Sequence, residues 1–127
     1  MEVIKEALAA WNRGDMDAVM SAMSHDVIFD PLASWSEGEG AEVTGLEAVM
    51  ERFRAIRDGC ERDWVEIRQI RDLGEAQVVA ECEWCAIPLG GHGDEVRVHG
   101  FDLFTLRDGR VTYFAYYPDL EAAALRE

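Results

Sequence analysis

Hydrophobic residues change their spacing near residue 62 of the chain. Before that point they recur every three or four positions, which is typical of amphipathic helices. Helices are predicted over 3–11, 16–23 and 46–56. After it they alternate with polar residues, which is typical of strands. Strands are predicted over 64–71, 76–87, 95–107 and 110–117.

Short signals refine the helical half. Gly14 follows the first helical pattern and predicts its end. Asp15 is a predicted N-cap for the second helix, and residues 44–47 have the sequence of a capping box before the third. Between the second and third helices, residues 27–31 are expected to form a short strand that ends at a proline, and 32–43 a loop.

The dipeptide Asp108-Gly109 is the strongest local signal in the strand-rich half, because it favours a two-residue type I′ turn. Such a turn fixes the register of the two flanking strands. It predicts Phe104 opposite Tyr113, and Asp102 opposite Ala115. Helices followed by a meander of antiparallel strands predict an α+β fold: three N-terminal helices on one face of a curved sheet of about four long strands plus one short strand.

One face of that sheet is predicted to contact the helices. Its members are Val78, Ala80, Cys82, Trp84, Ala86, Val96, Val98, Gly100, Asp102, Phe104, Leu106, Val111, Tyr113, Ala115 and Tyr117. Asp102 is the one carboxylate in this set. An unpaired buried carboxylate costs several kcal/mol or has a raised pKa, and Asp is a poor strand former. Asp102 is therefore a candidate functional residue.

Length and charge narrow the function classes. The 127 residues suit one domain over 1–127. Twelve Lys and Arg against 26 Asp and Glu give a net charge of −14, which disfavours nucleic acid and anionic membranes as partners. Neither a transmembrane run nor a signal peptide is expected from the pattern. Three cysteines, an odd number, indicate a reducing cytoplasmic location.

Several stretches carry a resemblance to a known superfamily. They are Gly14–Asp17, Asp30-Pro31, Thr44-Gly45 and Phe101–Val111. With the order of elements, they resemble the nuclear transport factor 2-like superfamily, and within it SnoaL-like proteins and ketosteroid isomerases. The resemblance covers nearly the whole chain and implies a cystatin-like cone. This fold hosts enzymes, binding modules and adaptors, so it does not by itself settle function.

The resemblance also implies roles for two carboxylates. In ketosteroid isomerases an Asp directly before a Pro is the general base, and Asp30 matches that pattern. A second Asp, kept protonated on a strand that ends at a hairpin, donates to the developing oxyanion, and Asp102 matches it. The isomerases also place an oxyanion-binding Tyr on the first helix, where this chain has Ala7. Loss of one such donor costs about 10²–10³ in rate, so SnoaL-like polyketide cyclases look closer.

These observations lead to a first hypothesis of an enzyme that performs cofactor-free acid–base chemistry, of cyclase or isomerase type, on a small apolar carbonyl compound. Candidate ligand-binding residues are Trp11, Met20, Phe53, Trp84, Phe104, Tyr113 and Tyr117. A non-catalytic ligand-binding module and a dimeric interaction module remain open. An epoxide hydrolase-like enzyme is a further alternative, although the core-facing Arg and last-strand Asp that it requires are not apparent.

The cysteines, His99 and the acidic loop give weaker indications of function. Cys82 and Cys85 lie three apart on a predicted strand and point to opposite faces, so no metal site is expected. His99 is predicted on the face opposite Asp102, although a bulge could turn it inward. The acidic loop 32–43 is expected to be solvated surface, with a lid over the cavity as the alternative.

The outer sheet face is predicted to form a homodimer interface, because its members would make a contiguous apolar surface. They are Val79, Ile87, Phe101, Leu103, Thr105, Thr112, Phe114 and Tyr116.

Overall fold

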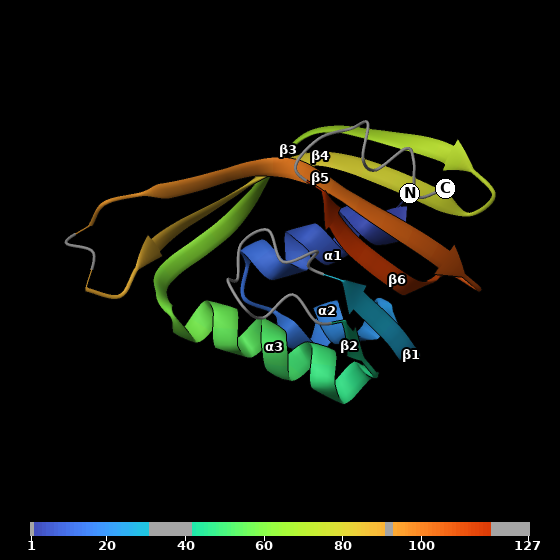
Figure 1. The fold of residues 1–127 in the computed structure, drawn as a ribbon, viewed down its shortest axis with the longest axis horizontal. Helices are drawn as coiled ribbons and strands as arrows, with labels where there is room; N and C mark the ends of the chain where they lie inside the picture. Colours follow the sequence, from blue (N-terminus) through green and yellow to red (C-terminus); the bar gives the residue numbers. More distant parts are fainter. Residues whose placement is uncertain (1, 31–41, 91–92, 118–127) are drawn as a thin grey trace.

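The computed structural model describes residues 2–30, 42–90 and 93–117 and has the predicted α+β architecture (Figure 1). The helices in these ranges are α1 (Glu2–Asn12), α2 (Met16–Ser21) and α3 (Leu46–Asp58). The strands are β1 (Met23–Asp30), β2 (Val43–Thr44), β3 (Cys60–Gly74), β4 (Gln77–Pro88), β5 (Val96–Arg107) and β6 (Arg110–Tyr117). None of the described helices is long and apolar enough to cross a membrane.

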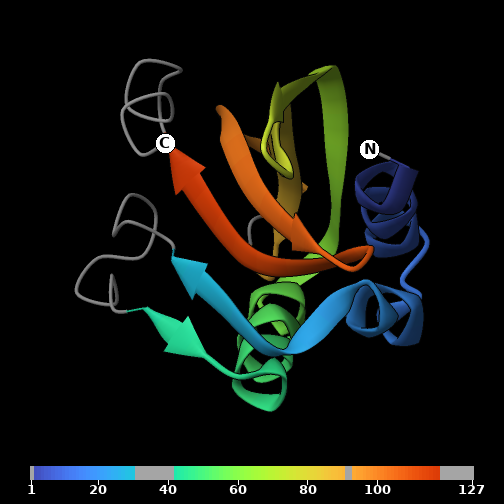
Figure 2. The ribbon, with the colours of Figure 1, turned by 90° about the vertical axis from the view of Figure 1, so that its right-hand side faces the viewer.

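The strands form a curved, unclosed sheet in the order β2-β1-β6-β5-β4-β3, and the helices pack against its inner face (Figure 2). Neighbouring strands are antiparallel except β1 and β6, which run parallel. This parallel pair joins the helical half of the chain to its last strand. The curvature leaves a space between helices and sheet, which is where the candidate site lies.

Two local predictions are confirmed and one is wrong. The Asp15 side chain accepts a hydrogen bond from the Ala18 backbone N–H at 3.1 Å, as expected of an N-cap. Asp108 and Gly109 have φ angles of 54° and 77°, as a type I′ turn requires. The capping box is absent, because Gly45 is the N-cap of α3 and makes no side-chain cap bond.

The second helix is shorter than predicted. It ends at Ser21, and β1 begins at Met23. The reason is non-local, since Met23 pairs with Val111 of β6 and the Val111 N–H donates to the Ala22 carbonyl at 2.8 Å. Helical spacing of Met16, Met20 and Met23 gave no sign of this pairing.

The register of the last hairpin differs from the prediction. An irregularity places Thr112 between the pairs Leu106–Val111 and Thr105–Tyr113. Beyond this bulge, each residue of β6 lies one position further along than expected, so Phe104 pairs with Phe114 and Asp102 pairs with Tyr116. An inserted residue reverses the inward and outward alternation of the strand. The predicted inner positions of Tyr113, Ala115 and Tyr117 are therefore wrong, and Phe114 and Tyr116 face inward instead.

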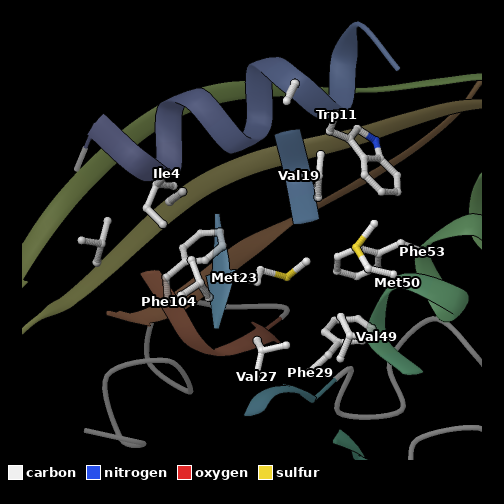
Figure 3. Close-up of a cluster of buried hydrophobic side chains, with 14 of the residues drawn as sticks. Ile4, Trp11, Val19, Met23, Val27, Phe29, Val49, Met50, Phe53 and Phe104 are labelled. Atoms are coloured by element: carbon white, nitrogen blue, oxygen red, sulfur yellow. The ribbon is translucent and has the colours of Figure 1, made fainter. Parts of the chain in front are cut away.

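The main core lies between the helices and the inner sheet face (Figure 3). Its aromatic centre joins α1, α3 and β1, with Trp11 and Phe29 each packed edge-on against Phe53 at centroid distances of 5.5 and 5.4 Å. Most of the predicted inner residues of β4 and β5 are confirmed, but Val96 at the start of β5 is 42% exposed and does not contact the helices. Val78, Ala80, Cys82 and Phe104 belong to this core, and Leu106 packs against it.

A second cluster lies on the outer face and is formed by Val79, Leu103, Ala115 and Tyr117. Val79 and Leu103 are only 3% and 1% exposed within the chain itself. They are therefore not available as open surface to a second copy. The homodimer through this face stays a prediction. The outer sheet face exposes less apolar surface than the sequence suggested.

Candidate functional site

An apolar cavity of about 120 Å³ lies between the helices and the inner sheet face. The described residues that line it are Ala7, Leu8, Trp11, Val19, Ala22, Met23, Phe29, Phe53, Ile56, Val65, Cys82, Trp84, Val98, Gly100, Asp102, Phe104, Val111, Phe114 and Tyr116. The wall is mostly aliphatic and aromatic, with few polar groups, as is usual for small-molecule sites. An engineered apolar cavity of similar size, about 150 Å³, holds benzene.

Asp102 contributes the only carboxylate among the described residues of the cavity wall. It lies near the middle of β5, so neighbouring strands surround it on both sides. The side chain is half-buried and borders the cavity. This burial raises its pKa from the usual 3.8 to about 7, and a hydrogen bond from the Cys82 thiol opposes part of the shift.

Two further titratable groups of the cavity wall face Asp102. Cys82 lies on β4, and burial raises the pKa of its thiol. Tyr116 is the cross-strand partner of Asp102, and burial together with the Asp102 charge raises the pKa of its phenol. The Tyr116 hydroxyl donates to the His99 carbonyl oxygen at 2.8 Å. The site thus holds one carboxyl group and two weak acids, and burial raises the pKa of all three.

Gly100 permits this arrangement because the Tyr116 ring packs against its backbone. A Cβ atom at Gly100 would collide with the ring and lie 2.6 Å from the phenol oxygen. The glycine therefore reflects a close packing contact, which is one of the usual reasons for a glycine within a strand.

The structure does not bring Asp30 and Asp102 together. Phe29 lines the cavity, and Asp30 follows it on β1, so it points to the other face of the sheet. There Asp30 is 8% exposed and accepts a hydrogen bond from the Tyr113 hydroxyl at 3.2 Å. The pair expected from the resemblance, with both carboxylates on one ligand, is not formed by this arrangement.

Some candidate ligand-binding residues lie at the cavity and others do not. Those that line it are Trp11, Phe53, Trp84 and Phe104. Met20 packs against the core instead, and Tyr113 and Tyr117 lie on the outer face because of the bulge. Sequence reasoning missed Phe114 and Tyr116 at the cavity for the same reason.

Sequence reasoning also missed a second buried carboxylate. Asp63 of β3 is 4% exposed, and its Oδ2 accepts hydrogen bonds from the indole N–H groups of Trp11 and Trp84, both at 2.9 Å. The Arg57 Nε lies 3.5 Å from Oδ1 of the same carboxylate. Asp63 belongs to the charged run 61–63, so nothing in its local sequence separated it from solvated neighbours.

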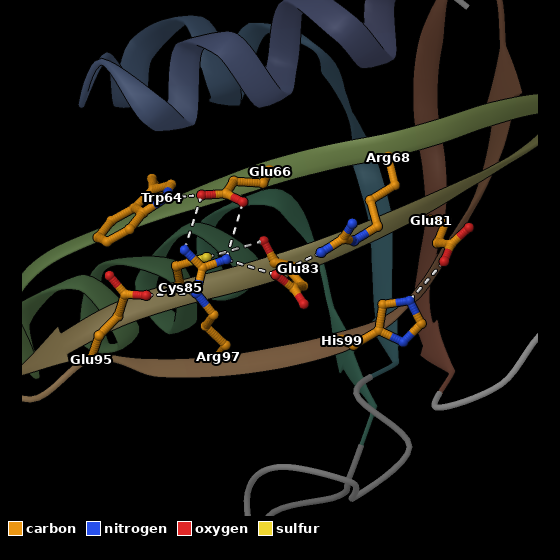
Figure 4. A network of polar contacts seen from close by, with 9 residues as sticks. All are labelled: Trp64, Glu66, Arg68, Glu81, Glu83, Cys85, Glu95, Arg97 and His99. Carbon is orange, nitrogen blue, oxygen red and sulfur yellow. Dashed lines mark hydrogen bonds and ion pairs between the residues drawn. The ribbon is translucent and has the colours of Figure 1, made fainter.

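The outer face of β3, β4 and β5 carries a network of charges (Figure 4). Arg97 contacts Glu83 at 2.7 Å, Glu66 at 3.1 Å and Glu95 at 2.6 Å. One carboxylate oxygen each of Glu66 and Glu83 and the sulfur of Cys85 lie within 4.8 Å of one another, close enough to bind one metal ion together. The Arg97 guanidinium already bonds both glutamates, so this cluster is explained by ion pairing.

The remaining candidates lie away from the cavity. His99 is on the outer face, where its Nε2 lies 2.8 Å from Glu81 Oε2 (Figure 4). Of the loop 32–43, residues up to 41 lie outside the described residues, so the lid alternative is untested. No arginine belongs to the described cavity wall, which disfavours the Asp-Arg-Asp set of an epoxide hydrolase-like enzyme.

Comparison of the sequence with known protein families identifies the family of this chain. A family model described as "SnoaL-like domain" matches residues 4–114. No curated protein is similar enough in sequence to match the chain.

Solved structures share the fold at low sequence identity. A candidate polyketide cyclase from Xanthomonas campestris is 23% identical, with a TM-score of 0.77 over 96% of this chain and 91% of that one. A Mycobacterium tuberculosis protein in complex with estradiol-17β-hemisuccinate is 19% identical, with a TM-score of 0.79 over 94% and 92%. A Catenulispora acidiphila protein with a ketosteroid isomerase-like fold, in complex with trimethylamine, is 21% identical, with a TM-score of 0.79 over 94% and 86%.

Proposed function

The chain belongs to the SnoaL-like domain family, and on that premise we propose that it binds a small apolar carbonyl compound in the cavity and transfers a proton on it through Asp102, without a cofactor. The observation that carries this proposal is the position of Asp102. Its carboxyl group is the only one among the described residues of an otherwise apolar wall. The complexes of two structural neighbours with small organic molecules support ligand binding in this fold.

The chemistry follows from the raised pKa of Asp102. A general acid–base group works best when its pKa is near the operating pH. With a pKa of about 7, Asp102 is present in both protonation states near neutral pH. As the carboxylate, it accepts the proton from the carbon next to the carbonyl, which leaves an enolate. The same carboxyl group then returns the proton to carbon or oxygen, so the proton balance closes within the site.

The enolate oxygen needs a hydrogen-bond donor other than Asp102 while Asp102 acts as the base. Tyr116 is the candidate, because its phenol borders the cavity across the strand from Asp102. It would exchange its bond to the His99 carbonyl oxygen for one to the ligand. This assignment replaces the Tyr that steroid isomerases carry on the first helix, where Ala7 borders the cavity here.

Proton transfer is assigned to Asp102 alone. Asp30 lies on the opposite sheet face, bonded to Tyr113, and this supports a single-carboxylate mechanism rather than a pair. The SnoaL-like cyclases, which use one Asp in an apolar cavity, are the closer parallel.

The test is deuterium exchange into 5-fluoro-2-indanone, a small apolar ketone with acidic protons next to its carbonyl. In D₂O, ¹H NMR follows loss of these protons, and ¹⁹F NMR follows binding. The protein should accelerate exchange over buffer, and Asp102→Asn should remove about 10² or more of that acceleration. Asp30→Asn is the matched carboxylate control and should retain the activity. Binding without accelerated exchange would reduce the protein to a ligand-binding module, and equal losses in both variants would restore the two-carboxylate mechanism.

A further inference from the structure

We infer that Asp63 is a positioning residue of the ligand cavity, which fixes the indole rings of Trp11 and Trp84 in the cavity wall. This goes beyond the proposed function, because it concerns the shape of the cavity and holds whatever chemistry Asp102 performs.

The geometry at Asp63 joins two distant parts of the chain. Trp11 comes from the end of α1 and Trp84 from β4, and both indole N–H groups donate to the same oxygen, Oδ2, at 2.9 Å. Both tryptophans line the cavity. Hydrogen bonds to a charged group are stronger than those between neutral groups, so a shared acceptor restricts both rings at once.

Arg57 at the end of α3 completes the arrangement. Its guanidinium lies 4.6 Å from the centroid of the Trp11 ring, and its Nη1 donates to the Trp11 carbonyl at 2.6 Å. Its Nε lies 3.5 Å from Asp63 Oδ1, which balances the buried negative charge. Phe53 packs edge-on against the same ring at 5.5 Å (Figure 3). Trp11 is therefore held by Asp63 at its N–H, by Arg57 over its ring and by the perpendicular ring of Phe53.

The neighbouring tryptophan shows that these contacts are selective. Trp64 follows Asp63 directly, yet its indole N–H donates to Glu66 at 3.0 Å on the outer face. Asp63 thus contacts the two described tryptophans that border the cavity, and Glu66 contacts one that does not. Asp63→Asn and Glu66→Gln therefore form a matched pair. The first removes the charge that accepts from the two cavity tryptophans, and the second removes the charge that accepts from Trp64.

The first readout is the indole N–H resonances in a ¹H–¹⁵N NMR spectrum, which need no ligand. Asp63→Asn should move the Trp11 and Trp84 resonances and leave that of Trp64 in place. Glu66→Gln should move only the Trp64 resonance. If Asp63→Asn leaves Trp11 and Trp84 unmoved, the carboxylate does not hold these rings and the inference is wrong.

The second readout is binding of fluorobenzene, followed by ¹⁹F NMR. This probe has no carbonyl group, so its binding does not depend on the proposed proton transfer. Asp63→Asn should weaken fluorobenzene binding about tenfold, and Glu66→Gln by less than twofold. Equal affinity for wild type and Asp63→Asn would overturn the positioning role, as would a wild-type protein that does not bind the probe at all.

Two further variants separate positioning from general loss of structure. Arg57→Lys keeps a cation beside Asp63 but loses the planar group over Trp11, and should weaken binding less than Asp63→Asn. In a Trp84→Phe background, Asp63→Asn should cost clearly less affinity than in wild type, because one of the rings it acts through no longer has an N–H. If Asp63→Asn does not fold, a double-mutant cycle that leaves Asp63 in place decides: full additivity of Arg57→Lys with Trp84→Phe in fluorobenzene binding would contradict the inference.

Discussion

Tyr116 lies directly across the strand pair from Asp102, because the bulge at Thr112 shifts β6 by one residue. Unbroken alternation would have placed Ala115 there and turned Tyr116 to the outer face. The phenol instead borders the cavity, packs against the backbone of Gly100 and donates to the His99 carbonyl oxygen. One extra residue in a strand thereby gives the candidate site its phenol group.

Deletion of Thr112 tests this relationship. Without the extra residue, the strand alternates regularly and still directs Phe114 and Tyr116 inward, so the variant should fold and bind fluorobenzene. The expected cost is about 1 kcal/mol in the free energy of unfolding, from the lost bond between the Thr112 hydroxyl and the Thr105 carbonyl. Deletion of Ala115, the control, should turn Tyr116 outward and abolish binding. Urea unfolding and ¹⁹F NMR measure the two effects.

Gly100→Ala should destabilise the protein by about 1–3 kcal/mol, since the new methyl group collides with the Tyr116 ring. Urea unfolding measures this cost. The combination with Tyr116→Leu, which makes room for the methyl group, should recover much of it, whereas two independent costs would simply add. Additive losses would show that the close approach of ring and glycine is not the cause.

Asp102 should titrate near pH 7, and carboxyl-carbon NMR measures this without a ligand. Because its pKa is raised in the folded protein, the folded state retains a proton that the unfolded chain releases above pH 4. This lowers the free energy of unfolding. The loss is absent when the pH is below the usual pKa of 3.8, grows as the pH rises toward 7, and is constant above pH 7. At pH 8 it is on the order of 4 kcal/mol at most.

Asp102→Asn removes that loss and should therefore raise the free energy of unfolding at pH 8 but not at pH 4. Urea unfolding at the two pH values gives the comparison. A variant that is less stable than wild type at pH 8 would contradict the desolvated environment of Asp102.

The rate of α-proton exchange should rise with pH and level off above about pH 7, because only ionised Asp102 accepts the proton. Exchange of 5-fluoro-2-indanone protons between pH 5 and 9, corrected for the buffer rate, measures this profile. A rate that falls as pH rises through 7 would assign Asp102 the role of acid in the limiting step.

Arg97→Ala should lower the melting temperature at low ionic strength, because Glu66, Glu83 and Glu95 then repel one another. Thermal unfolding in low and high salt measures this, and salt should recover about half of the loss by screening. Lys5→Ala, which removes an exposed pair with Glu2, is the control and should have little effect. An equal loss at both salt concentrations would argue against an electrostatic origin.

Local physical chemistry determined most of the framework from the sequence. Hydrophobic periodicity predicted the helices and four long strands, because each element must bury one face. Asp108-Gly109 predicted its turn, because only certain residues accept positive φ. The alternation along β5 placed Asp102 on the inner face, where the cavity now lies. Each of these inferences needs only the residues within one element.

Tertiary structure decided which groups meet. The bulge at Thr112 turned Phe114 and Tyr116 to the inner sheet face in place of Tyr113 and Tyr117. No residue type in β6 predicts this inserted position. The parallel pairing of β1 with β6 shortened α2 and directed Asp30 away from the cavity. Asp63 gained its role from indoles 52 residues before it and 21 residues after it. These contacts join segments that are far apart in the sequence. The hydrophobic pattern within one segment does not predict which residues of another segment it will pair with.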